Sequence, residues 1–218
     1  MCKALNQIIL VLFFVARASA TIINVPADFS SIQAGIDTAL AGDTILVSAG
    51  TYLENISYEG KDVALISESG PDQTILSGID SNTVVLFINQ ESRSAVLEGF
   101  TIQNGLGILK YPGISDERFA GGICIRFDSS PTLRNLIVTN NSVPIDEHVN
   151  NAAGGIGVAY GSAPLLEDIV ISNNQARYGG GLYSHHAAPI LKNVTFSDNY
   201  AARSGGGAGF KTSTPTIN

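Results

Sequence analysis

The chain has 218 residues, and 19 acidic side chains against 12 Lys and Arg give it a formal charge of −7. This balance argues against a nucleic-acid partner, because phosphates are bound largely by Lys and Arg. With 23 Gly, no Trp and only 14% charged residues, the composition is typical of a β-rich chain with many tight turns. The length suits one domain with a sizeable core.

The first 20 residues are predicted to be a cleaved export signal. Lys3 provides a positive start, Ile8–Ala16 is an apolar run, and Ala18–Ala20 fits the small-x-small cleavage rule. The alternative is a membrane anchor, but the apolar run is too short to span a bilayer. We therefore expect a mature chain that starts at Thr21, has no transmembrane span, and is secreted or held at the outer cell surface.

Residues 25–60 are predicted to form an N-terminal cap. Ser30 or Ser31 can cap a short helix, and the apolar face of this helix would carry Ile32, Ile36, Ala39 and Leu40. Period-two strands follow, separated by Gly-containing turns, and they are expected at 44–48, 51–56, 63–67 and 83–88. An amphipathic helix over the end of a solenoid would cover its exposed strand edges.

The second half of the chain repeats one pattern around a shared proline. The four segments span 121–141, 154–174, 179–199 and 205–218. Each starts with a Gly pair, which predicts a corner where neighbouring backbones pass closely. Apolar residues two positions apart then indicate strands with one buried face.

An asparagine column follows these strands. Its members are Gly105, Asn141, Asn174 and Asn199. Asn and Gly tolerate a left-handed backbone, so we expect the turn at these positions. Stacked asparagines can also hydrogen-bond from one layer to the next.

A repeat of this kind cannot bury its own faces, whereas stacked turns bury them against each other. Period two with frequent Gly excludes helical repeats. We predict an all-β fold over residues 21–218, a single-stranded right-handed parallel β-helix with an N-terminal capping helix at about 25–60 and repeat turns at about 61–218. A β-sandwich is the alternative, but it would not keep the same columns turn after turn. The sequence stops inside a repeat, so we expect the chain to be truncated at this end.

The stretch from Pro26 to Glu54, which contains SIQAGIDTALAGDTILVSAGTYLE, resembles the opening turn of pectin-lyase-like right-handed β-helix proteins. The later turns are similar to the repeats of secreted bacterial β-helix proteins and of chlamydial polymorphic outer-membrane proteins. The two resemblances cover most of residues 25–218 and imply the fold. They imply no single activity, because this fold serves lyases, hydrolases, esterases and adhesins alike.

The chain departs from the enzyme families that share this fold. It lacks Trp, which the pectate-lyase motif contains, and the polygalacturonase signatures are absent. Asp168 and Asp198 fall in turn columns and do not match the catalytic aspartates of pectin methylesterases. We therefore expect an exported, adhesin-like module that binds or displays at the cell surface and contacts polysaccharide. The alternative is a polysaccharide lyase or glycoside hydrolase-like enzyme acting on an anionic glycan.

Two insertions, at 104–120 and 141–153, leave the repeats at the same corner and should lie side by side. Their carboxylates are Asp116, Glu117, Asp146 and Glu147. Hard cations take clustered carboxylate oxygens, so these residues are candidate Ca²⁺ ligands. The alternative is a solvated polar loop that binds nothing.

The strands after the Gly pairs would form the floor of a groove. Adjacent strand residues point to opposite faces, so at most one of His185 and His186 can face it. In the third turn we expect Leu182 inward and Tyr183 and His185 outward, with the additional Gly taken up as a one-residue slip or bulge. In the first two turns the residues expected inward are Ile123, Ile125, Phe127, Ile156, Val158 and Tyr160.

The candidate polysaccharide-binding residues on this floor are Arg126, Asp128, Tyr183, His185 and Lys211. In a lyase, such side chains could remove a proton beside a uronate carboxylate and stabilise the resulting enolate. The alternative is an ordinary solvent-exposed strand surface.

Overall fold

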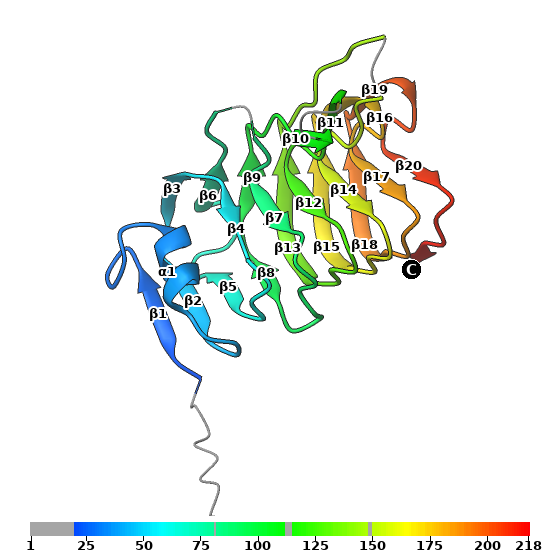
Figure 1. Cartoon of the computed structure of the whole chain (residues 1–218). Helices are drawn as coiled ribbons and strands as arrows, with labels where there is room; N and C mark the ends of the chain where they lie inside the picture. Colours follow the sequence, from blue (N-terminus) through cyan, green and yellow to red (C-terminus); the bar gives the residue numbers. More distant parts are fainter. Residues whose placement is uncertain (1–19, 81, 112–114, 148–149) are drawn as a thin grey trace, which may run out of the picture.

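The computed structural model describes residues 20–80, 82–111, 115–147 and 150–218, with the backbone alone at 109–111 and 115–117. Its strands stack as successive turns of a parallel β-helix, and a short helix covers one end (Figure 1). The predicted export signal lies almost wholly outside the described residues. Within them, no helix combines the length and the apolar character needed to cross a membrane.

The helix α1 (Ile32–Thr38) begins at Ser31, whose Oγ accepts a hydrogen bond from the backbone N–H of Ala34 at 3.3 Å. The carboxylate of Glu54 accepts two further N–H groups of the first turn, from Ile32 at 2.9 Å and Gln33 at 3.0 Å. A negative charge at this end also complements the helix dipole. The predicted capping helix is thus confirmed, and its N-terminal donors are satisfied.

The predicted apolar face of the helix needs one correction. Ile32 and Ile36 are fully buried, but Leu40 is 66% exposed. The helix ends before it, because Ala39 already has an extended backbone. The strand expected at 51–56 is likewise divided in two, since Glu54 turns away to cap the helix.

Two long parallel sheets run along the β-helix. The first contains β1 (Ile22–Val25), β2 (Thr44–Val47), β5 (Ala64–Ser67), β8 (Val96–Glu98), β13 (Thr132–Thr139), β15 (Leu165–Ser172), β18 (Ile190–Ser197) and β21 (Thr216–Ile217). The second contains β4 (Ile56–Ser57), β7 (Val85–Phe87), β12 (Ile123–Ile125), β14 (Ile156–Ala159), β17 (Leu182–His185) and β20 (Ala208–Lys211). Their inward side chains form one continuous apolar core.

Of the remaining strands, three branch off the first sheet and four form two separate two-stranded sheets. They are β3 (Gly50–Leu53), β6 (Thr74–Ser77), β9 (Thr101–Gln103), the parallel pair β16 (Gln175–Tyr178) and β19 (Tyr200–Ser204), and the antiparallel pair β10 (Ile108–Tyr111) and β11 (Ser115–Phe119). The first half of β13 pairs with β8 and its second half with β9. Each later turn therefore carries a long, bent strand.

The bend lies at one left-handed residue in each long strand, namely Asn135, Asp168 and Asn193, with φ between 49° and 54°. Asn and Asp adopt this conformation more readily than other side chains. Asn193 Nδ2 also donates to Asp168 Oδ1 at 2.7 Å. This confirms Asp168 as a member of a turn column.

The asparagine column forms the predicted ladder. Asn141 Nδ2 donates to Asn174 Oδ1 at 3.1 Å, and Asn174 Nδ2 donates to Asn199 Oδ1 at 3.0 Å. The same two oxygens accept the backbone N–H groups of Asn141 and Asn174, both at 3.0 Å. The expected left-handed residues lie one position earlier than predicted, at Asn104, Asn140, Asn173 and Asp198.

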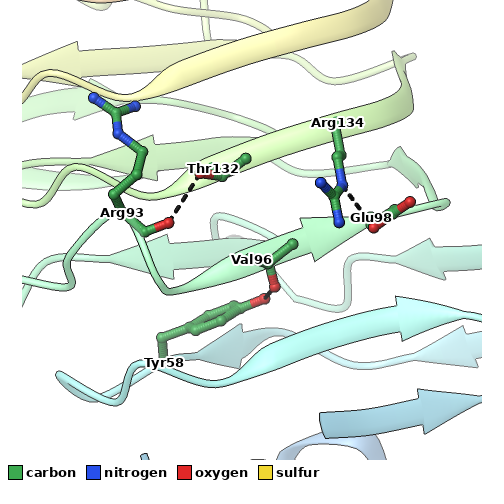
Figure 2. A network of polar contacts seen from close by, with 6 residues as sticks. All are labelled: Tyr58, Arg93, Val96, Glu98, Thr132 and Arg134. Atoms are coloured by element: carbon green, nitrogen blue, oxygen red, sulfur yellow. Dashed lines mark hydrogen bonds and ion pairs between the residues drawn. The ribbon is translucent and has the colours of Figure 1, made fainter. Parts of the chain in front are cut away.

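Side chains also connect successive turns (Figure 2). The buried hydroxyl of Tyr58 donates to the Val96 carbonyl at 2.6 Å. On the surface, Arg134 Nε lies 2.7 Å from Glu98 Oε2, one turn away. These contacts hold neighbouring turns in register.

Candidate functional site

The second sheet is built on a stacked corner of glycine pairs. These are Gly121–Gly122, Gly154–Gly155, Gly180–Gly181 and Gly206–Gly207, linked by backbone hydrogen bonds from turn to turn. A Cβ atom on Gly155 would lie 2.5 Å from the carbonyl oxygen of Gly181, so no larger residue fits. The predicted close approach of backbones is confirmed.

The additional glycine of the third turn produces no bulge, and that prediction is wrong. Gly179 occupies the column of Ala120 and Ala153, and all three residues have φ between 58° and 65°. The strands β14 and β17 pair from Ile156↔Leu182 onward without a register shift. A glycine has simply replaced alanine at a left-handed position.

The predicted faces of β17 are confirmed. Leu182 and Ser184 are fully buried, whereas Tyr183 and His185 are half-buried on the outer face. In the first two turns, Ile123, Ile125, Ile156 and Val158 point inward as expected.

Phe127 and Tyr160 do not point inward, and this part of the prediction is wrong. Phe127 is 46% exposed, and Tyr160 packs against a separate outer cluster. Both residues are left-handed, with φ of 59° and 53°. The chain turns at these positions, so the period-two alternation ends one residue before them.

The register places one outer column along the second sheet. Ala159 pairs with His185, and His185 pairs with Lys211. Arg126 follows Ile125, the partner of Val158, and therefore takes the equivalent place one turn earlier. We call Arg126, Ala159, His185 and Lys211 the outer column.

Two neighbouring hollows lie along the outer column. The first, called the groove, has a volume of about 400 Å³, and it is lined by Asn150, Ala152, Tyr178, Tyr183, His185, Ser204, Gly209, Phe210 and Lys211. The second, called the Arg126 slot, has about 10 Å³, and it is lined by Phe119, Arg126, Ala159, Tyr160, Tyr183 and His185. Tyr183 and His185 line both hollows, so the groove and the Arg126 slot are adjacent.

Four of the five candidate binding residues are therefore brought together. Asp128 is the exception, since it lines neither hollow. It is left-handed, with φ 64°, and its carboxylate lies against Gly161 of the next turn. Asp128 belongs to a turn at the end of β12.

A column of residues just before the Gly pairs was missed by the sequence prediction. Phe119 pairs with Ala152, Ala152 with Tyr178, and Tyr178 with Ser204, so these four residues form a wall beside the outer column. This confirms that the ends of the two insertions lie side by side. Each wall residue stands two positions before a Gly pair, and extending the repeat alignment upstream would have found the column.

Arg126 is enclosed by rings. Its guanidinium carbon lies 4.6 Å from the ring centroid of Phe127, 5.1 Å from that of Tyr160 and 5.7 Å from that of Phe119. The residue is only 5% exposed. Among the described residues, its Nε has no hydrogen-bond partner.

The phenol of Tyr183 stays protonated in this surface, so it can donate a hydrogen bond to a ligand. Burial, with a smaller contribution from Tyr178, raises the pKa of its phenol above the ordinary value of 10.0. The phenol is therefore neutral at physiological pH. Its ring lies 6.5 Å from that of His185 and 6.4 Å from that of Tyr178.

The predicted calcium site stays a prediction. Asp146 and Glu147 are exposed, while the side chains of Asp116 and Glu117 lie outside the described residues. Within the described part of the chain, no group of three or more His, Cys, Asp or Glu is arranged to hold a metal ion.

A family model described as a right handed beta helix region matches residues 77–217. A pectin methylesterase solved in complex with hexasaccharide VII has a similar structure, with a TM-score of 0.53 and 14% identity over 93% of this chain and 67% of that one. Pectin methylesterase PemA from Erwinia chrysanthemi gives a TM-score of 0.52 and 13% identity over 87% of this chain and 58% of that one. No curated protein matches the sequence. Identities this low establish a common fold, and the chemistry has to come from the residues of this chain.

Proposed function

This chain belongs to the right-handed β-helix family, and from that premise we propose that it binds a linear polysaccharide along its second sheet. The observation that carries the proposal is the groove, where Tyr178 and Tyr183 line the same hollow as His185 and Lys211 of the outer column. Neighbouring parallel strands lie about 4.8 Å apart, so the turns present contacts at regular intervals along the axis. A regular polymer is the ligand that such a surface fits.

The lining has the chemistry that sugars require. Tyrosine rings offer apolar faces with a polar tip, which suits the apolar face of a sugar ring and its hydroxyl groups. Asn150 and Ser204 add hydrogen-bonding groups, and Lys211 adds a positive charge at one end. One of the structural neighbours was solved with a hexasaccharide, which supports a saccharide ligand for this fold. The predicted export signal would place the groove outside the cell, where polysaccharides are displayed.

Catalysis on an anionic glycan is the second candidate function. It is supported by His185 and Arg126, which share the Arg126 slot and could act as the base and the cation of a β-elimination. However, the described lining of both hollows contains no Asp or Glu, whereas glycoside hydrolysis normally uses two carboxylates. The raised pKa of Tyr183 also keeps its phenol from acting as a base near neutral pH. Binding is the function that these residues support best.

An array of polysaccharides probed with the purified protein tests this proposal. We expect retention on one class of linear polymer, without ultraviolet-absorbing unsaturated product. Release of such product would favour the lyase alternative. Retention on none of the polymers, and no product from them, would overturn the proposed function.

A further inference from the structure

Arg126 is the most unusual cation of the described outer face. Burying an unpaired charge is costly, and such groups are normally paired or solvated. The rings of Phe119, Phe127 and Tyr160 offset part of this cost through cation–π attraction. They do not satisfy the guanidinium N–H donors, which point outward in the plane of the group.

One of these donors lacks an acceptor. The Nε of Arg126 is buried and has no partner among the described residues. The described ion pairs link Arg134 with Glu98 and Lys192 with Glu167, and neither includes Arg126. Among the described residues, the site thus offers no acceptor atom to this Nε and no ion-pair partner to the guanidinium.

The Arg126 slot has the size of one such atom. Its volume of about 10 Å³ is close to that of a single water-sized sphere. A water molecule would satisfy the Nε donor but would bring no negative charge to the guanidinium. An anionic oxygen supplies both, and charge-assisted hydrogen bonds are about twice as strong as neutral ones.

We propose that the Arg126 slot receives one oxygen of an anionic substituent, a carboxylate or a sulfate ester, carried by the glycan that lies in the groove. The identification of the ligand as a glycan rests on the proposed function, whereas the anion site itself rests on Arg126 alone. Tyr183 and His185 line both hollows, so a sugar stacked in the groove can place its substituent in the slot. The groove then selects acidic over neutral polymers of the same backbone.

Nuclear magnetic resonance of the Arg126 Nε–H group tests the anion site directly. Acetate and methyl sulfate are titrated separately into ¹⁵N-labelled protein, with chloride at equal ionic strength as the reference. Arg126→Lys identifies the resonance by removing it. Arg134 is the matched control, because its Nε is already bonded to Glu98 at 2.7 Å.

We expect a saturable shift at Arg126 and none at Arg134. Saturation by acetate alone identifies a carboxylate, saturation by methyl sulfate alone identifies a sulfate ester, and saturation by both identifies a general anion site. If Arg126 follows the chloride reference with both anions, or if Arg134 shifts equally, the proposal is wrong.

A second measurement separates this proposal from the proposed function. The affinity of the protein is compared for an acidic polysaccharide and for its carboxyl-reduced or desulfated counterpart. We expect Arg126→Gln to lower the acidic-to-neutral ratio about tenfold, and Lys192→Gln, outside both hollows, to leave it unchanged. Equal binding of both polymers by the unaltered protein overturns the anion proposal while polysaccharide binding stands. A saturable shift of the Arg126 resonance with acetate, without binding of any polymer, overturns polysaccharide binding while the anion site stands.

Discussion

Removing one asparagine from the ladder, at Asn174, should lower the free energy of unfolding substantially. This residue is 1% exposed and lies in the middle of the ladder. Its Oδ1 accepts the backbone N–H of Asn141 at 3.0 Å, and its Nδ2 donates to the Val138 carbonyl at 2.9 Å. The substitution Asn174→Ala removes both contacts together with the two amide bonds of the ladder, to Asn141 and Asn199.

The expected cost follows from the groups left behind. Asn141 is fully buried, so its backbone N–H loses its acceptor where water cannot replace it. A buried donor without a partner costs about 1–3 kcal/mol, and the void left by the amide adds to this. We expect Asn174→Ala to lower the free energy of unfolding by about 3 kcal/mol.

Urea unfolding measures this difference by linear extrapolation. The control is Gln175→Ala, the next residue, whose exposed side chain makes one contact of 3.3 Å with Ser142. We expect this control to change stability by less than about 0.5 kcal/mol. If Asn174→Ala costs no more than Gln175→Ala, the ladder does not stabilise the stacked turns and the reasoning is refuted.

Three further predictions concern buried groups. Burial raises the pKa of Tyr58 well above 10.0, so above about pH 10 the folded chain keeps a proton that the unfolded chain releases, and the free energy of unfolding should fall as the pH rises. Tyr58→Phe should reduce this fall in urea unfolding at alkaline pH. An unchanged pH dependence in the variant would contradict the prediction. Burial raises the pKa of the Cys124 thiol to about 12, so a disulfide reagent at mildly alkaline pH should modify it only after unfolding; prompt reaction of the folded protein would oppose this. Gly155→Ala should lower the melting temperature, because its Cβ would meet the Gly181 carbonyl at 2.5 Å, and an unaltered melting temperature would count against the tight corner.

The fold could be predicted from the sequence because the repeats fix it at many positions at once. Period-two columns, the Gly pairs and the asparagine column each determine one feature of a turn, and stacking repeats that feature. Phe127 and Tyr160 were misplaced because bulky residues rarely adopt a left-handed backbone, and nothing local signals it. The strand predicted at 51–56 includes Glu54, although β3 ends at Leu53, because Glu54 caps α1 through a tertiary contact that the local sequence does not indicate.

The site was only partly predictable, for a similar reason. Tyr183, His185 and Lys211 could be assigned to one face because alternation and register are properties of the repeat. The burial of Arg126 was not predicted, because the rings around it come from Phe127 and Tyr160, at left-handed positions that alternation does not foresee, and from Phe119, upstream of the repeat segments as aligned. The calcium ligands predicted on the insertions stay a prediction, because the side chains of Asp116 and Glu117 lie outside the described residues.

The groove assignment is tested most directly by a pair of lysine substitutions. Lys211 lines the groove, whereas Lys192 lies on β18 of the first sheet and contacts Glu167 at 3.4 Å. Affinity for the polysaccharide retained on the array is measured for Lys211→Ala and Lys192→Ala at one ionic strength. We expect Lys211→Ala to weaken binding about fivefold and Lys192→Ala to match the unaltered protein. Equal losses in both variants, or no loss in Lys211→Ala, would contradict binding along the second sheet.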